Sequence, residues 1–126
     1  MRSISVALAV LLTACAHMAP HIEEAMLSDR LFCGLSIPGG GTVAQAEVDA
    51  FIAEVVEPRF PEGFTVWRAR GEWRGGSEET VIIEVVHPAR VEHDRAVREI
   101  AQEYRRRFRQ EAVLRVTMPA RMELER

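Results

Sequence analysis

The chain has 126 residues, of which 48% are hydrophobic and 28% are charged, and its formal net charge is −3. This length accommodates one small domain and is too short for two ordinary cores with a linker. The acidic excess excludes binding to nucleic acid through general charge attraction. Apolar and charged residues occur at globular frequencies, which excludes a low-complexity chain.

The first residues have the pattern of a bacterial export signal. Arg2 precedes an apolar run over residues 4–12, which is too short to cross a bilayer as a helix of roughly 20 residues. Residues 12–15 read Leu-Thr-Ala-Cys and resemble the lipobox of bacterial lipoproteins. That resemblance implies cleavage after residue 14 and acylation of Cys15. Because Ala16 rather than aspartate follows the cysteine, it also implies a place on the periplasmic face of the outer membrane.

The chain therefore divides into three parts. Residues 1–14 are the expected signal peptide, residues 15–29 the acylated cysteine with a tether, and residues 30–126 the folded domain. With Cys15 carrying lipid, Cys33 has no partner in the chain. It lies in an apolar stretch, and we expect a buried, unreactive thiol.

The folded part predicts the order strand, helix, two strands, helix, strand. Runs rich in β-branched and aromatic residues predict strands at 31–36, 64–73, 80–86 and 112–118. Apolar stripes predict helices at 43–57 and 91–109. Thr42 and Gln45 form a capping-box pattern at the start of the first helix. The three glycines at 39–41 predict a flexible turn before it.

This order implies a ferredoxin-like α+β sandwich, in which two helices cover one face of a four-stranded antiparallel sheet. The first and third strands should be central, and alternation assigns the two faces. The helix side is expected to hold Leu31, Cys33, Leu35, Val81, Ile83, Val85, Leu114 and Val116. The open face is expected to present Phe32, Ile82, Val86 and Val113 around Glu84 and Arg115. For the second strand, the sequence does not decide whether Val66 or Trp67 points to the open face.

Three blocks carry a resemblance to a known family: residues 30–36, 58–66 and 71–73. They are similar to a family of short bacterial proteins, many with lipoprotein signals, that contain a domain of unknown function. Tyr104, Phe108, Gln110 and Val113 continue the match, so the resemblance covers most of residues 30–118. It implies an exported, compact α/β protein and supplies no catalytic residue.

Arginines near tryptophans form the best local group of polar residues. Such groups suit a carboxylate, phosphate or sugar ligand, and they equally suit intramolecular ion pairs on a sheet. We favour ion pairs, with Glu84 bound to an arginine of the second strand. The group comprises Arg59, Trp67, Arg68, Arg70, Trp73, Glu84 and Arg115.

Two histidines flank the end of the third strand and the start of the second helix. His87 and His93 could ligate a metal or act as acid and base, but no further ligand stands at a recognisable spacing. No nucleophile motif is present. The sequence therefore indicates no metal, no cofactor and no catalytic set.

These observations lead to a lipid-anchored envelope protein that acts by binding or assembly rather than by catalysis. Its expected partners are the membrane, through the lipid, and a second copy, through the open sheet face. The candidate ligand or interface residues are Phe32, Trp67, Arg68, Ile82, Glu84, Val86 and Arg115.

The alternative is a small-ligand-binding protein or a cofactor-independent enzyme resembling dimeric α/β-barrel proteins. Those proteins enclose a cavity between sheet and helices. The side chains expected to line it here are Trp67, Arg68, His87 and Tyr104.

Overall fold

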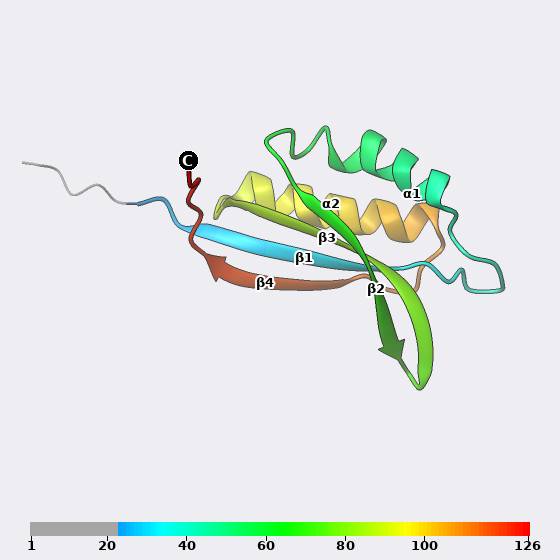
Figure 1. Cartoon of the computed structure of the whole chain (residues 1–126). Helices are drawn as coiled ribbons and strands as arrows, with labels where there is room; N and C mark the ends of the chain where they lie inside the picture. The colour runs from blue at the N-terminus through cyan, green and yellow to red at the C-terminus, as the bar shows by residue number, and fades with distance from the viewer. Residues whose placement is uncertain (1–22) are drawn as a thin grey trace, which may run out of the picture.

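The computed structural model describes residues 23–126, with Trp73 by its backbone alone, so the expected signal peptide and Cys15 lie outside the described residues. Four antiparallel strands form one sheet in the order β2-β3-β1-β4, and the helices cover one of its faces (Figure 1). The predicted ferredoxin-like α+β fold with central first and third strands is thereby confirmed. The elements are β1 (Met26–Gly34), α1 (Gln45–Phe51) with its π-helical continuation η1 (Ile52–Val56), β2 (Thr65–Trp73), β3 (Gly76–Pro88), α2 (Val91–Arg107) and β4 (Leu114–Ala120).

The core lies between the helices and the two central strands. The side chains that alternation assigned to the helix side of β1 and β3, and that of Leu35 directly after β1, are each at most 2% exposed: Leu31, Cys33, Leu35, Val81, Ile83 and Val85. Phe51 and Tyr104 meet edge to face at 5.2 Å between ring centroids. Burial of each large apolar side chain stabilises the fold by about 1.5–3 kcal/mol.

The first helix begins later than the capping-box pattern predicted. The Glu47 carboxylate accepts a hydrogen bond of 2.8 Å from the Ala44 amide, so this pair, and not Thr42 with Gln45, closes the helix start. The predicted turn before the helix is confirmed, because Gly39, Gly40 and Gly41 all have positive φ angles. None of the helices within residues 23–126 is long and apolar enough to cross a membrane.

Strand β1 begins at Met26, five residues before its predicted start, so the end of the predicted tether belongs to the sheet. Residues 26–29 pair with both β3 and β4. The polar sequence Ser28-Asp29-Arg30 concealed this extension, because a strand embedded between two others usually reads as apolar. Each of these three side chains instead has a partner on β3 or β4.

The facing of β4 was predicted wrongly. Leu114 lies opposite Phe32, and Arg115 lies opposite Leu31. Because opposite residues of antiparallel strands point to the same side, Leu114 is on the open face and Arg115 is on the helix side. Val116 points to the same face as Leu114, whereas Val113 packs against the core. The physical reason is Asp29, which is buried on the helix side and binds Arg115 there.

The β2–β3 hairpin extends beyond the helices. Its two-residue turn, Arg74 and Gly75, has positive φ at both positions, as the twist of a tight hairpin requires. The tip of the hairpin points away from the helices (Figure 1). Because the hairpin bends away from the helices, the open face of the sheet is concave at its hairpin end (Figure 1).

Candidate functional site

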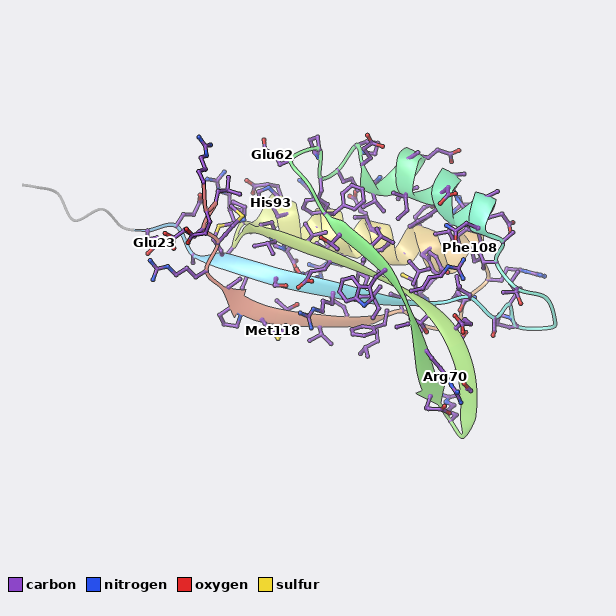
Figure 2. The ribbon with its side chains drawn as sticks, in the orientation of Figure 1. Glu23, Glu62, Arg70, His93, Phe108 and Met118 are labelled. Carbon is purple, nitrogen blue, oxygen red and sulfur yellow. The ribbon has the colours of Figure 1, made fainter. Side chains whose placement is uncertain are left out.

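The open face of the sheet carries a group of exposed apolar side chains. Trp67 lies opposite Ile82, which settles that Trp67 and not Val66 points to this face. Leu114 is 54% exposed and Val86 is 38% exposed. Met118 points to the side of β4 away from the helices (Figure 2). The face therefore presents an apolar surface to the exterior.

A cavity of about 500 Å³ lies at the hairpin end of this face. Its volume is within the range of small-molecule sites, about 300–1,000 Å³. Its apolar lining includes Phe32, Ile82 and Leu114, which come from three different strands. Segments 36–38 and 110–112 close one side, and the bent hairpin closes another.

Small residues hollow out the sheet at this point. Gly34, Ala69, Gly71 and Thr80 line the cavity, and a Cβ atom placed on Gly34 would lie 2.3 Å from Oε1 of Glu78. The Glu78 carboxylate thus occupies the space above Gly34 that any other residue would fill. Because Gly34 has no Cβ atom, the Glu78 carboxylate can lie against the backbone of the sheet within the cavity.

Glu78 is the carboxylate of this cavity that has no cationic partner among the described residues. It accepts one hydrogen bond of 3.1 Å from the Ser36 amide, and within residues 23–126 it forms no ion pair. Arg70 also lines the cavity (its position on the hairpin is labelled in Figure 2). Its guanidinium donates to Ser77 and Glu72.

Glu84 lies further along the same face and is balanced within the protein. It accepts hydrogen bonds from Ser28 at 2.8 Å and from Arg30 at 3.0 Å. The Ser28 hydrogen bond, followed by that of Arg30, lowers its pKa although partial burial opposes this. The predicted partner, an arginine of the second strand, was wrong, because β1 and not β2 supplies the cation. The Arg30 guanidinium lies 6.0 Å from the centre of the Trp67 ring.

The helix side of the sheet holds a second polar group, centred on Asp29. Its fully buried carboxylate binds the Arg115 guanidinium through two hydrogen bonds of 2.7 and 2.8 Å. It also accepts hydrogen bonds from Thr117 and from His87, the latter at 2.7 Å. Burial alone would raise the pKa of Asp29, but these donors outweigh it and lower the pKa to about 2.

His87 completes this network rather than a reactive site. It is 2% exposed, and its Nδ1 lies 2.8 Å from the Pro88 carbonyl oxygen while its Nε2 faces Asp29. Both neighbours are acceptors, so each ring nitrogen faces a hydrogen-bond partner within the protein. The ring of His93, at the start of α2 (Figure 2), is tilted relative to that of His87, with 5.4 Å between the ring centroids. Within residues 23–126, no three His, Cys, Asp or Glu side chains are grouped to hold a metal.

The structure divides the predicted site residues between the two faces. The open face holds Phe32, Ile82, Glu84 and Val86, as predicted. It also holds Trp67, whose facing the sequence had not decided. Arg68 and Arg115 do not join them, because both point to the helix side.

Arg68 donates to Gln45 at the start of α1, and Arg59 donates to Glu99 of α2. Arg59 thus forms an ion pair within the protein, as favoured for the arginine group, whereas the partner of Arg68 is an uncharged amide. The cavity observed lies on the open face of the sheet, whereas the alternative hypothesis expected one between sheet and helices. None of its expected lining residues, Trp67, Arg68, His87 and Tyr104, lines the cavity observed.

Sequence reasoning missed the residues that matter most at both sites. Gly71 lies opposite Glu78 in the hairpin, a pairing that follows from counting outward from the Arg74–Gly75 turn. Asp29 has the same parity as Leu31 and Cys33, so extension of the strand by two residues would have placed it on the helix side. The position of the Glu78 carboxylate over Gly34 had no such signal, since it depends on the pairing of β1 with β3.

Comparison with known proteins places the chain in a family and shows its fold. The profile of the family described as "Protein of unknown function (DUF3574)" matches residues 28–124. No curated protein matches the sequence.

Two solved structures of a phage SAM lyase are similar in fold. The first, in complex with S-methyl-5'-thioadenosine, has a TM-score of 0.55 and 21% identity, covering 77% of this chain and 83% of that chain. The second, in the apo state, has a TM-score of 0.54 and 17% identity, covering 81% of this chain and 86% of that chain. At these identities the likeness concerns the arrangement of strands and helices.

Proposed function

The chain belongs to the DUF3574 family of proteins of unknown function, and we propose that it is a lipid-anchored bacterial envelope protein that acts by binding. The binding surface is the open face of its sheet, and the site is the cavity at the hairpin end. The role is non-catalytic. The proposal combines the lipobox-like residues 12–15 with the geometry of the folded domain.

The observation that carries the binding role is the cavity itself. It joins an apolar floor from Phe32, Ile82 and Leu114 with one carboxylate, Glu78, that lacks a cation partner among the described residues. An apolar pocket with a few placed polar groups is the usual composition of a small-molecule site. The fold resembles that of a phage enzyme whose structure holds a small molecule, S-methyl-5'-thioadenosine, which is consistent with a ligand-binding role.

The reactive side chains of the helix side support binding rather than catalysis. Both ring nitrogens of His87 are engaged in hydrogen bonds, and the ring is inaccessible to a substrate. Cys33 is fully buried, and burial raises the pKa of its thiol to about 12. A thiol in this environment is not ionised near neutral pH and is a poor nucleophile.

Binding in the cavity is tested with an uncharged aromatic probe. We expect indole-3-ethanol, added to the full chain in uncharged detergent micelles, to shift the NMR amide signals of Phe32, Ile82 and Leu114. Leu114→Ala should weaken these shifts, while the matched variant Leu124→Ala, at an exposed position after β4, should leave them unchanged. Shifts confined to the helix side, or none at millimolar probe, would contradict the proposed site.

The anchor is tested by mass spectrometry of the protein from bacterial membranes. The expected result is an N-terminal peptide that begins at Cys15 and carries acyl chains, since more than one chain gives stable membrane attachment. Cys15→Ala should release no such peptide, and Cys33→Ala should still yield it. A mature N-terminus at another residue without lipid would remove the anchored location and leave the binding site untouched.

A second copy of the chain is the alternative occupant of the open face. Trp67, Val86 and Met118 are exposed apolar side chains on it, outside the cavity, and grouped apolar surface often marks an interface. Light scattering would give the mass of a dimer, and Val86→Asp would return the monomer. Val86 is preferred to Ile82 for this test because Ile82 is only 6% exposed and its substitution would disturb folding. A monomeric wild-type protein at high concentration would exclude this candidate.

A further inference from the structure

The charge within the cavity is unevenly distributed. Three glutamates, Glu72, Glu78 and Glu111, and one arginine, Arg70, are among the residues that line it. Arg70 pairs with Glu72 at 3.2 Å, and Glu111 pairs with Arg74 at 3.2 Å. Of the carboxylates lining the cavity, Glu78 is left with a hydrogen bond from a neutral amide and no cation within the described residues.

The position of Glu78 strengthens the attraction it exerts on a ligand. Its carboxylate lies against the backbone of Gly34, where a Cβ atom would otherwise sit, and is half-buried. A charge on a surface partly shielded from water interacts more strongly with an opposite charge than it would in bulk solvent. The carboxylate therefore favours the binding of a positively charged group at this site.

The apolar floor lies next to this carboxylate on the same face. Phe32 and Gly34 are two residues apart on β1, and Leu114 lies opposite Phe32 on β4. Ile82 of β3 lies on the other side of Phe32. An aromatic ring such as that of Phe32 also attracts cations through its face. A ligand with an apolar body and a cationic end would therefore match both parts of the cavity.

We propose that the cavity selects a small organic cation, an amine or onium group joined to an apolar or aromatic body. The cationic group binds the Glu78 carboxylate, and the apolar body lies on Phe32, Ile82 and Leu114. This inference rests on the proposed binding role of the cavity and assigns the chemical class of its ligand. Glu78 is the residue that determines the preference for positive charge.

Three indole probes that differ in charge test the inference. Tryptamine is a cation at neutral pH, indole-3-ethanol is neutral and indole-3-acetate is an anion. Each is titrated into the full chain in uncharged detergent micelles, and binding is read from the NMR amide signals of Phe32, Gly34 and Leu114, so that uptake of the probe by micelles is not counted. We expect tryptamine to bind about tenfold more tightly than indole-3-ethanol, and indole-3-acetate to bind most weakly. Salt should reduce the difference.

Two matched variants assign the preference to one carboxylate. Glu78→Gln retains an acceptor for the Ser36 amide and should reduce the advantage of tryptamine to less than about threefold, with binding of the neutral probe unchanged. Glu79→Gln removes the same charge at the next position, whose side chain does not line the cavity. This control should keep the full preference. Well-dispersed NMR spectra of both variants establish that they are folded.

The outcomes separate this inference from the proposed function. If none of the probes shifts signals at the cavity, the cavity is no binding site. Both the proposed function and this inference are then overturned. If tryptamine and indole-3-ethanol bind equally, the cavity is a binding site and the assignment of a cationic ligand is overturned. Equal loss of preference in Glu78→Gln and Glu79→Gln would also overturn it, because the preference would then come from the general charge of the hairpin.

Discussion

Asp29 and Glu78 are carboxylates on opposite faces of one sheet, and their surroundings differ completely. Asp29 is buried under the helices and receives hydrogen bonds from Arg115, Thr117 and His87. Glu78 lies on the open face, over Gly34, with one hydrogen bond from a backbone amide. The first carboxylate connects β1, β3 and β4, while the second faces a cavity.

The difference shows how the same side-chain chemistry serves stability on one face and, under the proposed function, binding on the other. A buried carboxylate is tolerated only when its charge and acceptor positions are satisfied. Arg115 also binds Asp94 of α2 at 2.8 Å, so the network of Asp29 joins three strands to a helix. A partly exposed carboxylate without a cation is tolerated because water or a ligand can solvate it. Four substitutions or conditions test this comparison.

The largest effect is expected for Asp29→Asn. This change leaves Arg115 and His87 facing a neutral amide, and we expect the free energy of unfolding to fall by about 3–5 kcal/mol. Urea denaturation followed by circular dichroism measures it. The matched variant Glu84→Gln alters an ion pair on the open face and should change stability by about 0–1 kcal/mol. Similar losses in the two variants would mean that the two faces do not differ as described.

Acid should remove the contribution of Asp29 in a defined range of pH. The pKa of Asp29 is about 2 in the folded protein against 3.8 for an unperturbed carboxyl, so its stabilisation is complete above about pH 5 and is lost as the pH falls toward 2. The size of this contribution is roughly 2 kcal/mol. The difference in unfolding free energy between wild type and Asp29→Asn should shrink by this amount between pH 5 and pH 2. A constant difference would show that the ionised carboxylate is not what stabilises the fold.

A smaller effect is expected for Tyr104→Phe, which acts beneath the cavity. The Tyr104 hydroxyl donates a hydrogen bond of 2.7 Å to the Gly34 carbonyl oxygen and holds α2 against β1. Its removal should lower the free energy of unfolding by about 1 kcal/mol. Thermal unfolding measures this change, and Tyr104 is otherwise buried in apolar contacts that Phe retains. An unchanged stability would mean that the carbonyl finds another donor.

The smallest effect on stability is expected for Glu78→Gln. Because the carboxylate forms no ion pair within residues 23–126 and the glutamine oxygen can still accept from Ser36, unfolding free energy should change by less than about 0.5 kcal/mol. The same variant should lose the preference for cationic probes. A large loss of stability would show that Glu78 supports the fold, in the manner of Asp29, and would remove the contrast between the two carboxylates.

The succession of elements followed from local sequence, and the reasons are visible in particular residues. Leu31, Cys33 and Leu35 recur at every second position, which places them on one face of the strand, and all three are buried. The apolar stripe of α2, including Val97, Ile100 and Tyr104, recurs with helical spacing and is buried as expected. The pairing of the central strands then follows from the right-handed connections through the helices.

The polar residues were harder to place because their partners are distant along the chain. The hydrogen bonds of Asp29 to His87, Arg115 and Thr117 join residues 58, 86 and 88 positions apart. A pattern of apolar and polar residues assigns Arg115 to the exterior, since local sequence does not reveal a buried carboxylate from another strand. For the same reason, the start of β1 was predicted at Leu31, whereas the strand begins at Met26.

The sequence by itself determined the order of strands and helices, their antiparallel arrangement and the burial of the central strands, because these depend on periodicities of two and 3.6 residues. The tertiary structure decided which carboxylate is balanced by a cation and which lines a cavity without a cationic partner among the described residues. It did so by bringing Arg115 to Asp29 and by laying Glu78 over Gly34. Both outcomes depend on the register between strands that are far apart in the chain, and that register is fixed only when the whole sheet has formed.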